Sequence, residues 1–313
     1  MIIGLLLSAF FTLVELNCEN LFDLSHDTLH NDHDFLPEGA YHWNASRYWR
    51  KLNRIGQEII SCGGEDADWE LPDLVALCEV ENDSVMRDLT RRSLLRTARY
   101  EYVMTNSPDE RGIDVALMYS PFSFSLLNYH SIRVSPVEDM HPTRDILYVS
   151  GLLSCGDTLH VFVIHAPSRS GGERATRPHR LQVARCLAVS VDSVYSIHPE
   201  ARILVTGDFN DYSQSKSLQF LSDHELIDIS STACGSHGAK GTYRYRGQWG
   251  SLDHILASPS MADMLAECFI HDPPFLFEDD EKYGGVKPRR TFLGPRYLNV
   301  FSDHLPLLAR FRF

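Results

Sequence analysis

The sequence predicts an α/β fold in which mostly antiparallel sheets are covered by helices. Short runs rich in apolar and β-branched residues have the length and composition of strands, and several are separated only by short polar turns, as in antiparallel pairs. Two longer segments carry apolar residues at spacings of three and four, which is typical of helices that cover one face of a sheet. Together these patterns predict sheets at the centre and helices outside.

Each expected element follows from its own pattern. The run LVALC at 74–78 and the run ILVT at 203–206 are continuous apolar stretches typical of buried strands. The expected strands are Phe11–Asn17, Leu74–Cys78, Tyr102–Thr105, Val115–Tyr119, Ile146–Leu153, Leu159–His165, Ile203–Thr206, Asp253–Ala257 and Leu305–Phe313. The expected helices are Arg47–Ile60 and Glu173–Tyr195. The segment Asp272–Leu298 is rich in Pro, Gly and charge, and we expect a long loop there.

Size and composition favour one large domain. The chain has 313 residues, of which 43% are hydrophobic, and this is ample for a sizeable core. We find no tandem repeat or linker, so residues 11–313 are expected to form a single domain. The net charge of −13 argues against a dedicated, tight, non-specific nucleic-acid binder, although a nuclease that touches a few phosphates remains compatible with it. The seven cysteines show no CxxC spacing, which argues against a thiolate zinc site.

Residues 1–10 begin an apolar stretch, MIIGLLLSAFFTLV, that has no charge before Glu15. The stretch resembles the apolar region of an export signal without its basic start, and it is too short to span a membrane. The alternatives are a shortened signal and a long first strand. We slightly favour export to the periplasm or medium over a cytoplasmic location.

The stretch ILVTGDFNDY at 203–212 ends an apolar run with Asp208, Asn210 and Asp211. Such residues are common in turns, but they can also form a polar rim where a rigid strand holds ligands or catalytic groups. Asp208 and Asn210 are two residues apart, so on an extended backbone they would point to the same side. Asp211 would point the other way, and we assign it a role in the turn.

Other expected strands also begin or end with carboxylate, carboxamide or imidazole groups. These residues are Asn17, Glu79, His165, Asp208, Asn210, Asp253, Asp303 and His304. One such strand end is usually a turn, but a whole series suits one shared site. Carboxylate and carboxamide oxygens are the ligands that Mg²⁺ prefers, and histidines beside carboxylates suit proton transfer.

The ordered motifs with Asn17, Glu79, HAPS at 165–168, GDFN at 207–210, Asp253 and SDHLP at 302–306 resemble the endonuclease/exonuclease/phosphatase superfamily over nearly the whole chain. That resemblance implies a four-layered α/β/β/α sandwich with two mostly antiparallel sheets face to face. It also implies a metal-dependent hydrolase acting on phosphoester bonds. Any single motif would be weak, but the full set in order is specific.

The resemblance also implies roles for individual residues. Glu79 would be the central ligand of a Mg²⁺ ion, with Mn²⁺ or Ca²⁺ as alternatives, and Asn17 and Asp303 would complete or flank this metal site. Asp208 would orient and deprotonate the attacking water, with Asn210 beside it on the phosphate.

A second group of implied roles concerns charge on the phosphate and leaving group. His304, oriented by Asp253, would stabilise the transition state or protonate the leaving oxygen. His165 would be a second catalytic histidine, and Asp114 is the carboxylate expected to pair with it. Arg144 in the stretch PTRDIL is expected to bind phosphate.

The substrate class is the least determined. The stretch PSRSGGERATRPHR carries Arg169, Arg174, Arg177 and Arg180, a local positive patch suited to a polyanion. We therefore favour a nuclease acting on DNA. The alternatives are a phosphatase or phosphodiesterase acting on a small or lipid substrate, and an inactive interaction module. We expect a monomer that needs no obligate protein partner.

The run SHDTLHNDHD at 25–34 has two interpretations. Its histidines His26, His30 and His33 could form a second metal site, or the run could be a solvated loop. Because surface loops of this composition are common, we favour the loop.

Overall fold

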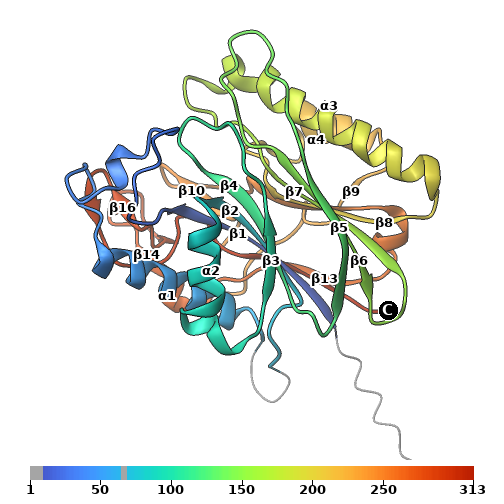
Figure 1. The fold of residues 1–313 in the computed structure, drawn as a ribbon, viewed down its shortest axis with the longest axis horizontal. Coiled ribbons are helices and arrows are strands. Elements are labelled where there is room, and N and C mark those ends of the chain that lie inside the picture. Colours follow the sequence, from blue (N-terminus) through green and yellow to red (C-terminus); the bar gives the residue numbers. More distant parts are fainter. Residues whose placement is uncertain (1–9, 65–68) are drawn as a thin grey trace, which may run out of the picture.

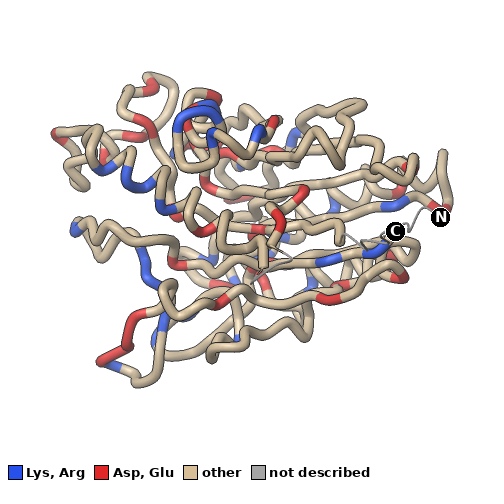
Figure 2. Tube along the Cα trace, turned by 90° about the horizontal axis from the view of Figure 1, so that it is seen from below, with Lys and Arg blue, Asp and Glu red and all other residues tan. Residues whose placement is uncertain are grey.

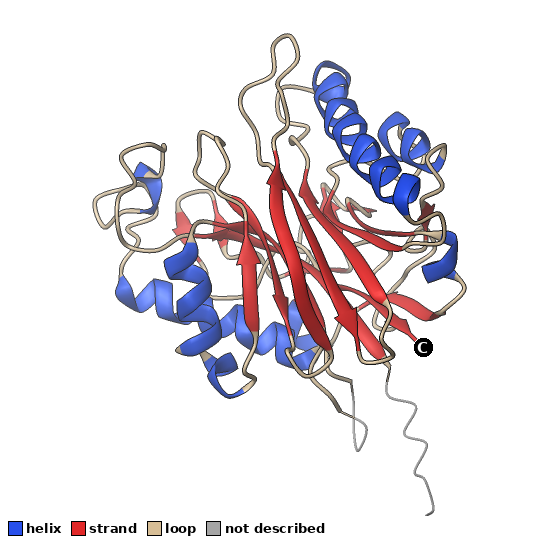
Figure 3. Cartoon of the chain, turned by 45° about the vertical axis from the view of Figure 1, so that its right-hand side comes forward, coloured by secondary structure: helices blue, strands red, loops and turns tan. Residues whose placement is uncertain are grey.

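Two six-stranded sheets pack face to face, and helices cover their outer faces (Figure 1; Figure 3). The structure is a computed structural model that describes residues 10–64 and 69–313. The expected sandwich of two sheets with helices outside is confirmed. The expected export signal in residues 1–10 lies almost wholly outside the described residues. Within the described residues, the structure contains no helix long and apolar enough to cross a membrane.

The first sheet has the strand order β13-β18-β1-β2-β4-β3. Its strands are β1 (Phe11–Leu21), β2 (Leu74–Val80), β3 (Glu101–Met104), β4 (Asp114–Tyr119), β13 (Leu265–Ile270) and β18 (Leu307–Phe311). The second sheet has the order β5-β6-β7-β8-β12-β9. Its strands are β5 (Phe124–Ile132), β6 (Ile146–Leu153), β7 (Thr158–His165), β8 (Arg202–Asp208), β9 (Ile227–Asp228) and β12 (Asp253–Ala257).

The helices divide between the two outer faces. The α-helices are α1 (Ala45–Ser61), α2 (Asp83–Arg91), α3 (Glu173–Ile197), α4 (Lys216–Ser222) and α5 (Pro259–Ala262). Short 3₁₀ turns are η1 (His33–Phe35), η3 (Leu94–Thr97) and η4 (Pro274–Leu276). Apolar side chains of α1 and α2 pack on the first sheet, those of α3 and α4 pack on the second, and a third apolar cluster fills the space between the sheets.

One parallel strand pair lies at the centre of each otherwise antiparallel sheet. β1 pairs with β2, and β7 pairs with β8, because α1 and α3 return the chain to the same end of the sheet in each case. Strand β12 runs antiparallel to β8, and its first residue, Asp253, is opposite Asp208. The C-terminal ends of the central strands therefore lie at one end of the sandwich, where the candidate residues gather.

The sequence patterns missed several elements. β5 carries mostly exposed polar residues, and β13 is only partly buried, so neither shows a clear alternation. The short helices α2 and α4 were also missed. The segment expected as a long loop contains two hairpins, formed by β14 (Phe277–Asp279) with β15 (Val286–Pro288) and by β16 (Phe292–Leu293) with β17 (Arg296–Tyr297). A further hairpin joins β10 (Tyr243–Tyr245) to β11 (Gln248–Gly250).

Candidate active site

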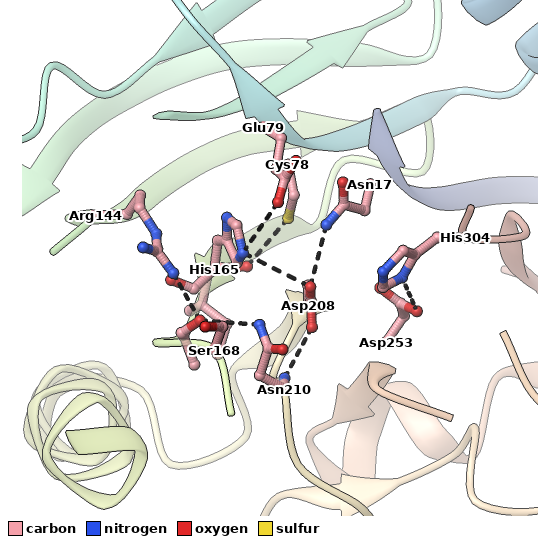
Figure 4. Close-up of polar contacts among 12 residues, drawn as sticks. Asn17, Cys78, Glu79, Arg144, His165, Ser168, Asp208, Asn210, Asp253 and His304 are labelled. Atoms are coloured by element: carbon pink, nitrogen blue, oxygen red, sulfur yellow. Dashed lines mark hydrogen bonds and ion pairs between the residues drawn. The ribbon is translucent and has the colours of Figure 1, made fainter. Parts of the chain in front are cut away.

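A cavity of about 890 Å³ opens at the end of the sandwich where the central strands of both sheets terminate. Its lining includes the predicted residues Glu79, His165, Asp208, Asn210, Asp303 and His304. Figure 4 shows Glu79, His165 and Asp208 close together, with the pair of His304 and Asp253 beside them. Residues that are far apart in the sequence thus face one space.

Glu79 reaches this space through a β-bulge. The register of β2 against β4 shifts between Cys78 and Val80, and Glu79 between them has a φ of 62°. The Oε2 atom of Glu79 accepts a 2.9 Å hydrogen bond from the backbone N–H of Asn20, and its Oε1 atom is 3.8 Å from Nε2 of His165. A left-handed backbone at a glutamate is unfavourable and is typically retained where it aims a side chain.

The neighbouring strand β1 has a matching irregularity. Its register against β2 shifts between Asn17 and Leu21, and Glu19 and Asn20 have φ values of 51° and 61°. Both residues line the cavity. The paired bulges therefore present Glu19 and Glu79 from adjacent strands to the same space.

Asp208 ends β8 and is buried at the base of the cavity. Its Oδ1 atom accepts a 2.8 Å hydrogen bond from the backbone N–H of Asn210, and its Oδ2 atom accepts one of 3.1 Å from Nδ2 of Asn17. Burial, followed by the negative charge of Asp253, raises the pKa of Asp208 to about 7. A carboxylate with a pKa near neutral pH is suited to accept a proton from water.

Asn17 lies within β1, and not at the end of a strand as expected. Its Oδ1 atom accepts a 2.9 Å hydrogen bond from the backbone N–H of Glu19. Because a backbone N–H can only donate, the amide nitrogen of Asn17 must face Asp208. The geometry therefore makes Asn17 an orienting partner of Asp208, and one lone pair of its oxygen remains for a metal ligand role.

His304 and Asp253 form a buried pair. The Nδ1 atom of His304 is 2.8 Å from Oδ2 and 3.0 Å from Oδ1 of Asp253, and Thr242 also donates to this carboxylate. Burial acts to lower the pKa of His304, but the carboxylates of Asp253, Asp208 and Asp303 outweigh it and raise the pKa well above the usual value. With Nδ1 held by Asp253, Nε2 is the nitrogen left for a substrate.

His165 does not pair with Asp114. The Asp114 carboxylate accepts hydrogen bonds from the Thr105 hydroxyl at 2.6 Å and from Ser107, because the turn after β3 folds over the start of β4. Nδ1 of His165 has no hydrogen-bond partner among the described residues. Burial, followed by the charge of Arg144, lowers the pKa of His165 well below its usual value, so its ring is neutral near pH 7. The expected pairing is therefore wrong, although His165 faces the cavity.

Arg144 does not line the cavity, contrary to the expectation that it binds phosphate. Its three guanidinium nitrogens donate to the carbonyl of His165 at 3.1 Å, the carboxylate of Asp109 at 2.9 Å and the carbonyl of Ala166 at 2.7 Å. These contacts use its donors to hold the end of β7. Arg111, which belongs to none of the sequence motifs described above, lines the cavity instead.

Asn210 reaches the cavity by a route that the sequence did not predict. It lies beyond the end of β8 with a φ of 49°, so an extended backbone does not align it with Asp208. Its side-chain amide donates to the Ala166 carbonyl at 3.1 Å. The alignment of Asp208 and Asn210 predicted for an extended strand is therefore wrong, but both residues line the same space.

Asp211 is more than a turn residue. It is 1% exposed, it accepts a 2.6 Å hydrogen bond from Ser217, and its Oδ1 atom is 2.9 Å from Nε of Arg180. Arg180 is equally buried and therefore does not belong to the expected surface patch. Of the patch, Arg169 lines the cavity, where its guanidinium lies 4.0 Å from the ring centre of Tyr212.

Three further acidic residues, Asp303, Glu19 and Glu15, lie in or beside the site. Asp303 pairs with Arg290 at 3.0 Å at the cavity wall. Burial, followed by the charge of Asp303, raises the pKa of Glu19 to about 8. Glu15 on β1 is fully buried, and both its carboxylate oxygens lack hydrogen-bond partners within residues 10–64 and 69–313. Burial, and then the charges of Asp253 and Asp208, raise the pKa of Glu15 well above its usual value.

Glu15 and Glu19 were missed although the sequence contains a signal for both. They lie two residues before and after Asn17 in a strand, and this spacing places side chains on the same face. The bulge moves Glu19 relative to that simple alternation, so only its general direction was predictable.

The cavity suits a divalent cation. Glu19, Glu79, Asp208 and Asp303 all line it, and the raised pKa values of Asp208 and Glu19 arise partly from neighbouring carboxylates. Ligand atoms of Asp208, Asp253 and His304 also lie within 4.8 Å of one another. Because Asp253 and Nδ1 of His304 already bind each other, Glu79 and its acidic neighbours are the better ligands for a hard cation.

The wall of the cavity also carries basic and aromatic residues. Basic residues on it are Arg111, Arg169, Arg246 and Arg290, and aromatic residues are Tyr41, Tyr212, Tyr243, Tyr245 and Phe292. Elsewhere, basic and acidic positions are interspersed along the chain (Figure 2). Arginine side chains therefore share the cavity wall with the acidic centre.

A sequence model described as "Endonuclease/Exonuclease/phosphatase family" matches residues 12–312. No curated protein matches the chain. A family protein from Bacteroides thetaiotaomicron has a similar structure, with a TM-score of 0.62, 14% identity, and coverage of 96% of this chain and 97% of that one. The mannosyl-6-phosphatase of the same species has a TM-score of 0.62, 16% identity, and coverage of 97% and 100%.

The catalytic domain of human Nocturnin, solved with a bound sulfate anion, has a TM-score of 0.60 at 17% identity, and the similarity covers 97% of this chain and 95% of that one. At such identities, these similarities show a shared fold and assign no substrate.

Proposed function

The chain belongs to the endonuclease/exonuclease/phosphatase family, and from this premise we propose that the cavity hydrolyses a phosphoester bond with a divalent cation held by Glu79. Mg²⁺ matches the oxygen ligands, and Mn²⁺ or Ca²⁺ shares that preference. Asp303 and Asn17 would flank the cation, as would Glu19. When bound, the cation would polarise a phosphoryl oxygen and offset its charge.

The remaining roles follow from protonation and geometry. Asp208, with a pKa of about 7 and both oxygens oriented by hydrogen bonds, accepts the proton of the attacking water. His304 is kept protonated by its carboxylate neighbours, so it donates to the developing negative charge or the leaving oxygen. His165 is neutral and contributes a hydrogen bond near the phosphate. The observation that carries this proposal is the convergence of Glu79, Asp208 and His304 on one cavity.

The substrate that fits best is a small phosphorylated molecule. The cavity volume of about 890 Å³ lies within the range of small-molecule sites, roughly 300–1,000 Å³. Tyr212, Tyr243 and Tyr245 offer flat apolar faces to a sugar or base, and Arg111, Arg169 and Arg246 offer positive charge to further anionic groups. On these grounds we favour a small phosphoester over the DNA that the sequence analysis favoured.

DNA remains the second candidate because of one observation. Arg174 is exposed at the start of α3, and Arg177 is partly exposed beside it, close in sequence to the cavity residue Arg169. If this surface holds a polymer, cleavage of DNA should weaken steeply as salt rises, through counterion release. Arg174→Glu should then reduce DNA cleavage while sparing a chromogenic diester.

The test is an activity panel with and without Mg²⁺. It compares p-nitrophenyl phosphate, bis-p-nitrophenyl phosphate, sugar phosphates, nucleotides, inositol phosphates and plasmid DNA. We expect hydrolysis of a small substrate, and this hydrolysis should require the cation and stop with EDTA. Glu79→Gln should reduce the rate of hydrolysis by orders of magnitude while the melting temperature is retained. Glu138→Gln, at an exposed position, is the matched control. Undiminished turnover in EDTA, or in Glu79→Gln, would refute the proposal.

A further inference from the structure

The loop between β1 and α1 brings together two histidines and one carboxylate at the surface. One ligand atom from each of His26, Asp32 and His33 lies within 4.8 Å of the others. The rings of His26 and His33 face one another, with centres 4.6 Å apart and planes inclined by 32°. Both histidines are exposed, whereas Asp32 is 2% exposed. This cluster is separate from the residues that line the cavity.

We propose that His26, Asp32 and His33 bind one late first-row transition metal ion, with Zn²⁺ the best match. Imidazole nitrogens suit Zn²⁺, Ni²⁺ and Cu²⁺, whereas Mg²⁺ prefers oxygen ligands. Two histidines and one carboxylate supply three protein ligands, and water would complete a tetrahedral site. The site therefore differs from the oxygen-rich catalytic centre in the metal that it selects.

The carboxylate of Asp32 is already oriented. Its Oδ2 atom accepts a 2.8 Å hydrogen bond from the backbone N–H of Asp27, and its Oδ1 atom is 2.5 Å from Nδ1 of His26. Ligating carboxylates in metal sites are commonly held by such backbone contacts. A metal ion would replace the proton shared by Asp32 and Nδ1 of His26, and the exposed side of His26 leaves this exchange open, unlike the buried pair of His304 and Asp253.

A simple surface hydrogen bond explains only part of this arrangement. It accounts for His26 and Asp32, but it does not account for the second imidazole, whose ring faces that of His26. His30, the third histidine of the run, lies elsewhere, with its Nδ1 atom 2.8 Å from the carbonyl of Asp109. A metal ion explains why His26 and His33, and not His30, approach the same carboxylate.

The position of the loop gives the site a structural purpose. Between the end of β1 and the start of α1, the chain forms only the short turn η1. Long loops with little secondary structure are usually functional or held by specific ties. The same loop carries Tyr41 of the cavity wall, and the backbone N–H of Asn31 donates a 2.7 Å hydrogen bond to the backbone carbonyl of Glu110, beside the cavity residue Arg111. A metal tie would therefore stiffen one wall of the cavity.

The test measures Zn²⁺ binding to tag-free, chelator-treated full-length protein by isothermal titration calorimetry in excess Mg²⁺, which occupies oxygen sites. We expect one Zn²⁺ per chain in the wild type and in Glu79→Gln. His33→Ala, and the double variant His26→Ala/His33→Ala, should weaken binding by roughly 100-fold. Zn²⁺ should raise the melting temperature of the wild type but not that of the double variant.

The matched control is His141→Ala. His141 forms a surface pair with Glu110 at 3.0 Å without a second histidine, so its removal should leave zinc binding unchanged. Since His33 is exposed, His33→Ala should fold normally, and circular dichroism without zinc checks this. The proposal is overturned if His33→Ala and the double variant bind Zn²⁺ as the wild type does, if Glu79→Gln abolishes binding, or if the wild type binds no Zn²⁺ under these conditions.

Discussion

At the scale of single residues, burial and a few hydrogen bonds give chemically similar groups different protonation states. His165 and His304 both line the cavity, but burial and the charge of Arg144 keep His165 neutral, while carboxylates keep His304 protonated. Asp208 and Asp211 are three residues apart, yet one faces the cavity and the other lies in a buried ion pair with Arg180. Residue type alone does not distinguish these roles.

Asp253→Asn tests the role of the buried pair. Removal of the Asp253 charge should lower the pKa of His304, since this carboxylate is a main cause of the raised value. A raised pKa keeps His304 protonated to higher pH, so the variant should lose activity at a lower pH than the wild type, by at least about one pH unit. The measurement is the pH dependence of kcat. An unchanged alkaline limb would show that His304 does not act as the proposed acid.

Asp208→Asn and Asp211→Asn form a contrasting pair. Asp208→Asn should lower kcat by orders of magnitude, because the carboxylate is proposed to accept a proton. The melting temperature should change little, because burial of the charged carboxylate does not stabilise the fold. Asp211→Asn should leave Arg180 buried without its charge partner and lower the free energy of unfolding by about 3 kcal/mol. Kinetics and chemical denaturation of both variants provide the comparison. The opposite pattern of effects would refute these assignments.

At the scale of elements, the parallel pairs and the bulges determine where polar side chains emerge. The crossover helices α1 and α3 bring the ends of β1 and β2, and of β7 and β8, to the same end of the sandwich. Gly207, before Asp208, has a φ of 138°, and a Cβ there would lie 1.9 Å from the Ile164 carbonyl oxygen. Close pairing of β7 and β8 next to the site therefore requires glycine at this position.

Gly207→Ala should separate β7 from β8 and lower the free energy of unfolding by more than about 3 kcal/mol. The new Cβ would overlap the carbonyl oxygen of Ile164, and the φ at this position is unfavourable for alanine. Activity should fall with it because His165 and Asp208 end these two strands. The control is Gly156→Ala, at a φ of 91° with nothing within 4 Å, which should cost only about 1 kcal/mol. Urea denaturation measures both, and equal losses would contradict the steric argument.

At the scale of the whole molecule, ionisable groups are buried between the layers. Glu58 on α1 is fully buried beneath the helix, and its carboxylate oxygens lack hydrogen-bond partners within the described ranges. Burial raises the pKa of Glu58 to about 8, against the opposing effect of Lys51. Lys51 is also buried, and it donates to the carbonyl of Phe301 at 2.7 Å. The contact between α1 and the first sheet is therefore sensitive to pH.

Glu58→Gln should reduce that sensitivity. Because the pKa of Glu58 is raised in the folded state, its protonated form stabilises the protein below about pH 4.5, and this stability is lost as pH rises towards 8. At about 1.4 kcal/mol per pKa unit, the loss from this residue is roughly 4 kcal/mol. Urea denaturation should show that the free energy of unfolding falls less between about pH 5 and pH 8 for Glu58→Gln than for the wild type. The exposed control Glu138→Gln should match the wild type. An equal fall for the wild type and both variants would show that Glu58 is not the source of the pH dependence.

The sequence patterns were sufficient to predict sheets covered by helices, most central strands and the helices α1 and α3, whereas the four-layered sandwich was implied by the family resemblance. These elements carry strong apolar periodicity, and their order and polar ends are local properties of the chain. It also predicted that Glu79, His165, Asp208, Asn210, Asp303 and His304 face one space. It did not predict β5 or β13, because partly exposed strands lack the burial that creates a clear pattern.

Only the tertiary structure decided which polar groups are partners. Asp114 binds Thr105 and Ser107 instead of His165, and Arg144 holds the end of β7, because turns that no periodic pattern describes bring their donors and acceptors together. The bulges that aim Glu19 and Glu79 depend on backbone conformations with positive φ, which glutamate alone does not signal. Residue types and spacing determine which chemistry is available, whereas packing determines which groups meet. The physical reason is that a hydrogen bond needs its two atoms within about 3 Å, and the residues that supply them can be far apart in the chain.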